Sequence, residues 1–308
     1  MILVCGGLAD PVTRFFCDRL KEHGVAYRFV DQRVFPCGYS MSYRWQKDAL
    51  TGWFASPEWR IGLAELTGVY LRHLNPVLRK TIKLDSSKIS RSLHTENDLA
   101  LESVFADLPC PVANRFAGGT SNESKPYQAL LIRRSRLRIP PTLVTNDLSA
   151  AGQFYDKFAG RVIYKSLSGR SIGTRLLSKD RLPHLFSSSR VPLQLQEFIP
   201  GANVRVHVVG DQLIATRISS EAVDYRFAIR ENYPVRMEQT SVPESVAEDC
   251  IRLTEECGLL FSGIDLKETP AGEFYCFEIN PSPAFSFFER ITNQSISLAL
   301  MSLLGSKL

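Results

Sequence analysis

The sequence lacks the patterns that mark several large classes of protein. No apolar run reaches the roughly 18 residues that a membrane-spanning helix needs, and the first residues show no basic leader of a secretory signal. The seven cysteines are odd in number and widely spaced without a C-x-x-C pair, and the five histidines are scattered. We therefore expect a cytoplasmic protein with reduced thiols, no membrane partner and no zinc site.

The familiar nucleotide-binding motifs are also missing. Neither G-x-x-x-x-G-K-[ST] nor G-x-G-x-x-G occurs, and the set of protein-kinase motifs is absent. A nucleotide site in this chain must therefore be built by a different fold.

What is present is an ordinary globular composition. The 308 residues, 44% hydrophobic and 22% charged, allow two or three structural units. The net charge of +5 is mild, and its densest patch is Arg133, Arg134, Arg136 and Arg138. Because no aromatic or groove-fitting partner accompanies this patch, it predicts a solvated helix face and no nucleic-acid site. An acidic peptide would also suit it.

The first unit, residues 1–112, has a βαβ rhythm that predicts a parallel sheet with covering helices. Residues 35–60 are rich in aromatic and turn residues and predict an antiparallel excursion. Pro109 and Pro111 mark the end of the unit. The expected strands are 2–5, 26–30 and 69–72, and the expected helices are 11–23 and 96–106.

A central unit, 113–200, and a C-terminal unit, 201–308, follow. The central unit is expected to contain helices 125–136 and 147–158, strands 142–145 and 162–165, and a flexible loop at 166–174. The pattern then turns largely to strands, at 194–199, 204–209, 212–219, 260–267 and 273–279, with one helix that has Pro243 in its first turn and stops at Gly258.

The most informative segment is a hairpin over residues 263–280. Alternate side chains of a strand share a face, so Glu278 and Asn280 lie on one side. If the turn is even in length, Asp265 lies opposite Cys276 and diagonal to Glu278. Asp265, Glu278 and Asn280 then present three oxygen ligands, a set that suits magnesium, which also keeps positions for water and phosphate.

The other face of the hairpin is expected to be apolar and to pack on a core. Carboxylates on an inner sheet are costly unless a cation balances them, which favours a metal site. A solvent-facing polar side remains the alternative, and an odd-length turn would break the convergence. The residues expected on the apolar face are Ile264, Leu266, Tyr275, Phe277 and Ile279.

Two lysines and three arginines could hold phosphate. Lys125 opens a helix after a Gly/Ser/Asn-rich loop, and Lys165 ends a strand just before a glycine-bearing loop whose amides could close over phosphates. Arginines on successive strands suit a phosphoryl group in transfer. Taken singly, such lysines and arginines are usually ordinary surface residues. The arginines are Arg205, Arg217 and Arg226.

The order of these segments resembles the ATP-grasp ligases, in the branch of glutamate-adding ribosomal-protein ligases and microviridin-type peptide maturases. The likeness runs over most of the chain. It rests on Lys125, K-x-x-x-G at 165–169, Q-E-F-I at 196–199, N-V-R at 203–205, G-I-D at 263–265 and F-E-I-N-P at 277–281, and on the maturase-like V-F-P at 34–36 and V-D-Y-R at 223–226.

The resemblance implies an α/β protein with an ATP-grasp fold, in which two α+β lobes clamp ATP after an N-terminal parallel α/β pre-ATP-grasp domain. It also implies a role for each motif residue. The phosphates would be held by Lys125, Lys165, Ser168 and Gly169, the adenine by Glu197, Phe198 and Ile199, and the ribose by Asn203. The γ-phosphate or acyl phosphate would be bound by Arg205, Arg217 and Arg226. One or two magnesium ions, which manganese could replace, would be bound by Asp265, Glu278 and Asn280.

Two departures bear on specificity. Related ligases often have an acidic residue where Asn203 stands, and the chain has Y-L-R-H-L-N-P at 70–76 where maturases tend to show a Tyr-Arg-Arg-Pro-like strand. The implied activity is ATP-dependent joining of a carboxylate to an amine or hydroxyl through an acyl phosphate. The expected substrate is an acidic ribosomal precursor peptide, and a homodimer is expected. The alternatives are an amino-acid or small-peptide ligase and an inactive nucleotide-binding protein.

Overall fold

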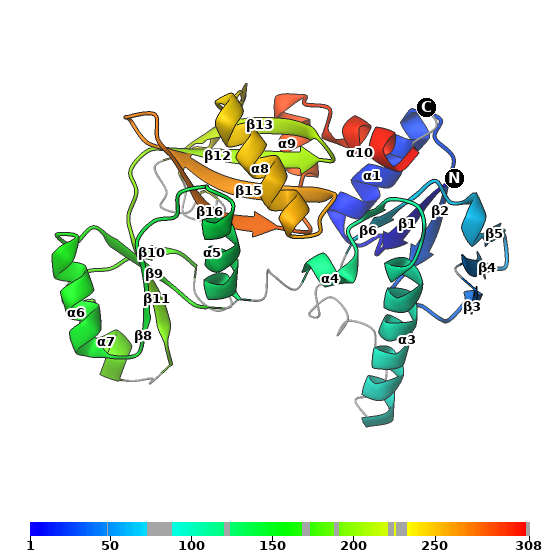
Figure 1. Ribbon diagram of the computed structural model, residues 1–308, viewed down its shortest axis with the longest axis horizontal. Helices are drawn as coiled ribbons and strands as arrows, with labels where there is room; N and C mark the ends of the chain where they lie inside the picture. Colours follow the sequence, from blue (N-terminus) through cyan, green and yellow to red (C-terminus); the bar gives the residue numbers. More distant parts are fainter. Residues whose placement is uncertain are drawn as a thin grey trace.

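A computed structural model describes most of the chain as three units arranged along the long axis of the molecule (Figure 1). In the part of the chain it describes, no helix is both long and apolar enough to cross a membrane. The described residues are 1–47, 49–72, 88–119, 124–167, 173–187, 191–220, 225 and 233–305, with the backbone alone for 88–95, 119 and 187.

The first unit is built on a parallel sheet in the order β2-β1-β6-β7, as the βαβ rhythm predicted. All five residues of β1 are buried, because apolar layers cover both faces of a parallel sheet. Asp10 caps α1, where its carboxylate accepts a 2.8 Å hydrogen bond from the Thr13 amide. The elements are β1 (Ile2–Gly6), α1 (Pro11–Glu22), β2 (Tyr27–Asp31), β6 (Gly68–Leu71) and β7 (Val112–Ala113).

The aromatic-rich excursion forms a separate antiparallel sheet in the order β3-β4-β5, which confirms the prediction for residues 35–60. A long helix, α3, follows and begins earlier than the predicted residue 96. The elements are β3 (Ser40–Gln46), β4 (Ala49–Ala55), β5 (Arg60–Gly62), the 3-10 helix η1 (Leu63–Glu65), α3 (Lys88–Ala106) and α4 (Phe116–Gly119).

The second unit is a small antiparallel sheet in the order β10-β9-β11-β8, with two helices beside it (Figure 1). Its core contains Ala151, Val162 and Leu195. The strand that ends at Lys165 has the predicted bounds. The elements are β8 (Thr142–Thr145), α6 (Leu148–Lys157), β9 (Val162–Lys165), β10 (Arg175–Leu176), α7 (Arg181–Ser187) and β11 (Leu193–Glu197).

The third unit is an antiparallel sheet in the order β14-β13-β12-β15-β16. Helix α8 covers it, with Cys250 and Leu253 buried in the core. The elements are β12 (Ala202–Val209), β13 (Gln212–Ser219), β14 (Arg236–Thr240), α8 (Glu244–Glu256), β15 (Phe261–Glu268), β16 (Phe274–Asn280), α9 (Ser286–Thr292) and α10 (Ile296–Gly305).

Packing crosses the predicted unit boundaries. Helix α5 (Lys125–Arg134) belongs to the predicted central unit, but its Ile132 lies in the core of the third sheet, and the Gln128 amide donates a 2.5 Å hydrogen bond to the Ile279 carbonyl. Helix α10 packs on the first unit, where the Gly68 Cα would carry a Cβ only 2.5 Å from the Leu304 carbonyl oxygen. The division at 112 and 200 stays a prediction.

No helix or strand was predicted from the sequence over α9 and α10. The ten residues of α10, I-S-L-A-L-M-S-L-L-G, are apolar almost throughout, so they lack the periodicity that predicts an amphipathic helix. The structure explains this composition, because α10 is buried between the first sheet and the third.

His207 on β12 is a buried histidine held among aromatic rings. Its ring centroid lies 5.0 Å from that of Phe288 and 6.4 Å from that of Phe261. Burial, with a smaller contribution from the positive charge of Arg205, lowers the pKa of His207 well below 6.5. The folded protein therefore holds His207 neutral under mildly acidic conditions in which the unfolded chain would protonate it.

We predict that His207 makes the protein less stable below pH 6.5. Because the unfolded chain takes up a proton that the folded chain excludes, His207 should lower the free energy of unfolding by up to about 1.4 kcal/mol per pH unit. Urea unfolding from neutral pH down to about pH 5 should show a shallower pH slope in His207→Leu than in wild type. The exposed His23→Leu should keep the wild-type slope, and equal slopes in all three proteins would contradict the prediction.

Candidate active site

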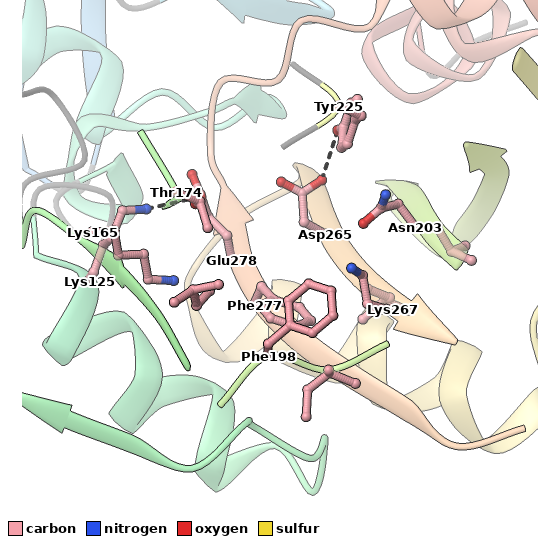
Figure 2. Close-up of a pocket in the computed structure, with 14 residues that line it drawn as sticks. Lys125, Lys165, Thr174, Phe198, Asn203, Tyr225, Asp265, Lys267, Phe277 and Glu278 are labelled. Atoms are coloured by element: carbon pink, nitrogen blue, oxygen red, sulfur yellow. Dashed lines mark hydrogen bonds and ion pairs between the residues drawn. The ribbon is translucent and has the colours of Figure 1, made fainter. Parts of the chain in front are cut away.

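A pocket lies between the second and third units and is lined by both (Figure 2). It contains about 710 Å³ of empty space, part of it open to solvent. The structure thus brings together seven of the eleven predicted site residues that it describes. Those that line the pocket are Lys125, Lys165, Phe198, Ile199, Asn203, Asp265 and Glu278.

Asp265 and Glu278 face each other directly across β15 and β16. The predicted register, with Asp265 opposite Cys276, is wrong: Cys276 pairs with Leu266, and a register shift between Asp265 and Leu266 then brings Glu278 opposite Asp265. A regular ladder from the Leu266 pair would place Phe277 opposite Asp265. The β-bulge adds one residue and returns the glutamate to the face of the aspartate.

The bulge also changes which residues form the apolar face. Ile264, Leu266 and Ile279 are buried in the core of the third unit, as predicted. Tyr275 is only partly buried and Phe277 lines the pocket, so the prediction is wrong for these two. Phe274 and Cys276 take their places in the core.

Each carboxylate is matched by a cation from another element. Lys125 Nζ lies 3.1 Å from Glu278 Oε2, and Arg205 Nη1 lies 2.8 Å from Asp265 Oδ1. The Tyr225 hydroxyl donates a 3.2 Å hydrogen bond to the same Asp265 oxygen (Figure 2). The side chains of Asp265 and Glu278 keep 19% and 15% of their surface exposed, so both carboxylates can be reached from the pocket.

These carboxylates fit a divalent cation that also binds phosphate. Magnesium is held in proteins by one or two carboxylates and completes its shell with water and phosphate oxygens. Asn280 lies two residues after Glu278 on β16, and its Oδ1 accepts a 2.9 Å hydrogen bond from the Ser282 amide. Within the described ranges, no three His, Cys, Asp or Glu side chains cluster as a metal site, so the candidate donors are two carboxylates and an amide.

The arginines are placed differently from the prediction. Neither Arg205 nor Arg217 lines the pocket, because Arg205 is buried against Asp265 and Arg217 pairs with Glu268. Burial by itself would lower the pKa of the Arg205 guanidinium, but the charge of Asp265 and nearby acidic groups raises it above its ordinary value. Arg205 is therefore a fixed positive charge behind Asp265. Arg226 lies outside the described residues.

The two predicted phosphate lysines sit at the same end of the pocket (Figure 2). Lys165 is buried at the end of β9, and its Nζ donates a 3.1 Å hydrogen bond to Gln196 Oε1. Lys125 is the first residue of α5, where the Ser124 cap and the helix N-terminus favour a nearby anion. Ser168 and Gly169 lie outside the described residues.

Phe198 and Asn203 lie away from the two lysines in the pocket (Figure 2). Ile199 also lines the pocket. Lys267 lines the pocket as well, with its Nζ 5.3 Å from the centre of the Phe198 ring. The sequence argument missed Lys267, although it stands two residues after Asp265 on the same strand and hence on the same face. Glu197 does not line the pocket; its carboxylate lies 3.8 Å from the Arg161 guanidinium.

Gly263 gives the next prediction, because the Arg205 guanidinium fills the space that a side chain at 263 would need. A Cβ there would lie 2.0 Å from Arg205 Nη2 and 2.7 Å from Pro283 Cβ. We predict that Gly263→Ala lowers the free energy of unfolding by about 1–3 kcal/mol. In the matched control Gly152→Ala, on helix α6, the new Cβ meets nothing within 4 Å. Urea unfolding that shows equal stability for the two variants would refute this account of Gly263.

Comparison with known proteins identifies the fold and the family. The family model of the RimK-like ATP-grasp domain matches residues 120–304, more than half of the chain. A probable alpha-L-glutamate ligase of Rhodopirellula baltica is 24% identical over 212 residues, which are 66% of this chain and 52% of the relative. The alignment therefore spans about half the length of that relative.

Solved structures match over almost the whole chain. The ATP-grasp ligase PsnB, complexed with minimal precursor, Mg and ADP, is 27% identical with a TM-score of 0.80, over 99% of this chain and 96% of PsnB. The macrocyclase MdnC from Microcystis aeruginosa MRC, bound with precursor peptide MdnA, is 22% identical with a TM-score of 0.80, over 99% of each chain. The predicted ATP-grasp fold is thereby confirmed, and the chain belongs to the family of RimK-like ATP-grasp domains.

Proposed function

We propose that this chain is an ATP-dependent ligase that activates a carboxylate as an acyl phosphate and joins it to an amine or a hydroxyl. The observation that carries the proposal is the pair of opposed carboxylates, Asp265 and Glu278, in a pocket that Lys125 and Lys165 enter from separate elements. The two carboxylates can bind a divalent cation, and the two lysine ammonium groups can bind the triphosphate that accompanies it.

Binding of the nucleotide follows from the two ends of the pocket. Lys125 and Lys165 hold the phosphates, and Ser168 and Gly169 are proposed to bind them as well. Phe198 and Ile199 contact the base, with Glu197 at the same hinge, and Asn203 meets the ribose. The Lys267 ammonium lies beside Asn203. This end of the pocket therefore offers hydrogen-bond donors, where related ligases often have an acidic residue.

Asp265, Glu278 and Asn280 hold magnesium, as one ion or two, and manganese can substitute for it. When bound, the cation neutralises the triphosphate and polarises the γ-phosphate for attack. Arg205 acts here by holding Asp265 in place, which revises its expected contact with phosphate. Arg217 and Arg226 remain the candidates for contact with the transferred phosphoryl group.

The reaction needs little chemistry from the protein beyond positioning and charge. An oxygen of the substrate carboxylate attacks the γ-phosphorus and ADP leaves. The amine or hydroxyl then attacks the acyl carbon of the acyl phosphate, loses its proton, and phosphate leaves. The product is an amide or an ester, and each bond formed removes one water from the substrate.

A ribosomal precursor peptide with acidic side chains is the substrate that the neighbouring structures support best. PsnB and MdnC are both complexed with precursors, and the likeness to each spans nearly the full chain. We also propose that the protein is a homodimer and that it is located in the cytoplasm.

A second candidate, ligation of a free amino acid, is favoured by the curated relatives. The relative from Rhodopirellula baltica is named for glutamate ligation and aligns with two thirds of this chain. Such a reaction would add the mass of an amino-acid residue, which is the amino acid less one water, to the acceptor, whereas cyclisation would remove water from a single peptide.

Mass spectrometry of acidic peptides incubated with the protein and Mg-ATP tests the proposed activity. We expect ADP to form and a peptide to lose one water mass per new bond. Addition of the mass of an amino-acid residue would support the second candidate. If neither peptides nor amino acids give any product or any ADP above background, the ligase proposal fails.

The carboxylate pair is tested by Glu278→Gln. Removing one metal-binding carboxylate takes away several kcal/mol of charge stabilisation in the transition state, so turnover should fall more than about 100-fold. Glu273→Gln is the matched control, because Glu273 precedes β16 and pairs with the exposed Arg138. A Glu278→Gln enzyme with turnover equal to that of Glu273→Gln would contradict the assignment. Loss of metal-assisted ATP affinity alone, in a protein without turnover, would favour the inactive alternative.

A further inference from the structure

The turn that follows β16 is held by side chains from outside its own sheet. Gln128 of α5 donates to the Ile279 carbonyl at 2.5 Å, and Asn114 donates to the Pro281 carbonyl at 2.5 Å. Arg72, at the end of β6, donates to the carbonyls of the next two residues. Backbone groups in and beside the turn at 280–283 are therefore fixed by Arg72 of the first unit, by Asn114 just after that unit and by Gln128 of α5.

Arg72 makes the largest number of these contacts. Its Nη1 lies 2.5 Å from the Ser282 carbonyl oxygen, 2.8 Å from Ser282 Oγ and 3.1 Å from the Pro283 carbonyl oxygen. Its Nε donates at 3.2 Å to Asp10, the carboxylate that caps α1. The Arg72 side chain keeps only 14% of its surface exposed. A guanidinium can donate to Asp10 through Nε and to the turn through Nη1 at the same time, whereas the single nitrogen of a lysine ammonium cannot span both.

Ser282 connects Arg72 to a predicted metal ligand. The Ser282 amide donates at 2.9 Å to Asn280 Oδ1, the oxygen that Asn280 would offer to a cation. A carbonyl oxygen has two lone pairs, so this hydrogen bond fixes the direction of Oδ1 and leaves one lone pair for the metal. Groups that orient a metal ligand in this way influence the affinity of the site for its ion.

We propose that Arg72 is a positioning residue for the divalent-cation site, through which the first unit sets the orientation of Asn280 by way of Ser282. The inference rests on the proposed function, since it presupposes that Asp265, Glu278 and Asn280 bind a cation. A purely structural ion pair would need only Asp10, but most of the acceptors of Arg72 lie on the turn.

Arg33 supplies a matched control. It stands just after β2 in the same unit, and its guanidinium pairs with Asp31 through Nε and Nη2. Its side chain is 28% exposed, so Arg33→Met removes a comparable ion pair. The hydrogen bonds described for Arg33 stay within residues 31–33 and do not reach the turn.

The test measures Mn²⁺ binding to the full-length protein with ADP by electron paramagnetic resonance. ADP affinity is measured separately in EDTA. We expect Arg72→Met to bind Mn²⁺ about tenfold more weakly than wild type, with metal-free ADP affinity unchanged. Arg33→Met should match wild type in both measurements. Equal Mn²⁺ affinity in Arg72→Met and Arg33→Met would overturn the inference.

A further variant keeps the test decisive if Arg72→Met does not fold. Arg72→Lys retains a positive charge beside Asp10, but its one ammonium nitrogen cannot reach both Asp10 and the carbonyls of the turn, so this variant should also weaken Mn²⁺ binding. Wild-type affinity in this variant would overturn the inference. A different result would refute the proposed function. A wild-type protein that binds Mn²⁺ and ADP but never turns over would refute the ligase and leave the role of Arg72 intact.

Discussion

Two negative charges face each other across neighbouring strands, and the rest of the site is arranged around them. Like charges directly opposite each other destabilise a sheet, and carboxylates in a partly buried pocket need compensation. Arg205 lies behind Asp265 on β12, and Lys125 reaches Glu278 from the start of α5. Under the proposed function, a cation bound to both carboxylates releases Lys125 to the phosphates while the buried Arg205 stays in place.

The geometry of this pair depends on one irregularity in the hairpin. The bulge beside Asp265 is what places Glu278 opposite it, and the same bulge places Phe277 in the pocket. Core packing restricts any slip of this register, because Ile264, Leu266, Cys276 and Ile279 would have to leave the core together. Burial of the apolar face of the hairpin therefore keeps Asp265 and Glu278 opposite each other on the other face.

Local patterns predicted much of this arrangement. Strand β9 ends at Lys165 and helix α5 begins at Lys125, as expected, because a short apolar run and a serine cap are local features. The shared face of Glu278 and Asn280 followed from strand alternation alone. The order of the motifs carried the resemblance to the ATP-grasp ligases, and the matched RimK-like domain confirms that family.

The rest depends on contacts between distant parts of the chain. The parity of the turn at 269–273 and the bulge beside Asp265 could not be derived from residue types, so the predicted register was wrong. Arg205 was expected to contact phosphate. Its pairing with Asp265 could not be predicted, because it depends on β12 lying beside β15. Arg72 and Ser282 are 210 residues apart, and no local pattern joins them. The burial of α10 is likewise a tertiary property.

Crystals grown with Mn²⁺ and a non-hydrolysable ATP analogue, measured at a wavelength where manganese scatters anomalously, test the central claim most directly. The account predicts an anomalous peak about 2–2.5 Å from carboxylate oxygens of both Asp265 and Glu278, with the analogue's phosphates between Lys125 and Lys165. A nucleotide bound in the pocket with manganese coordinated by neither carboxylate would contradict it.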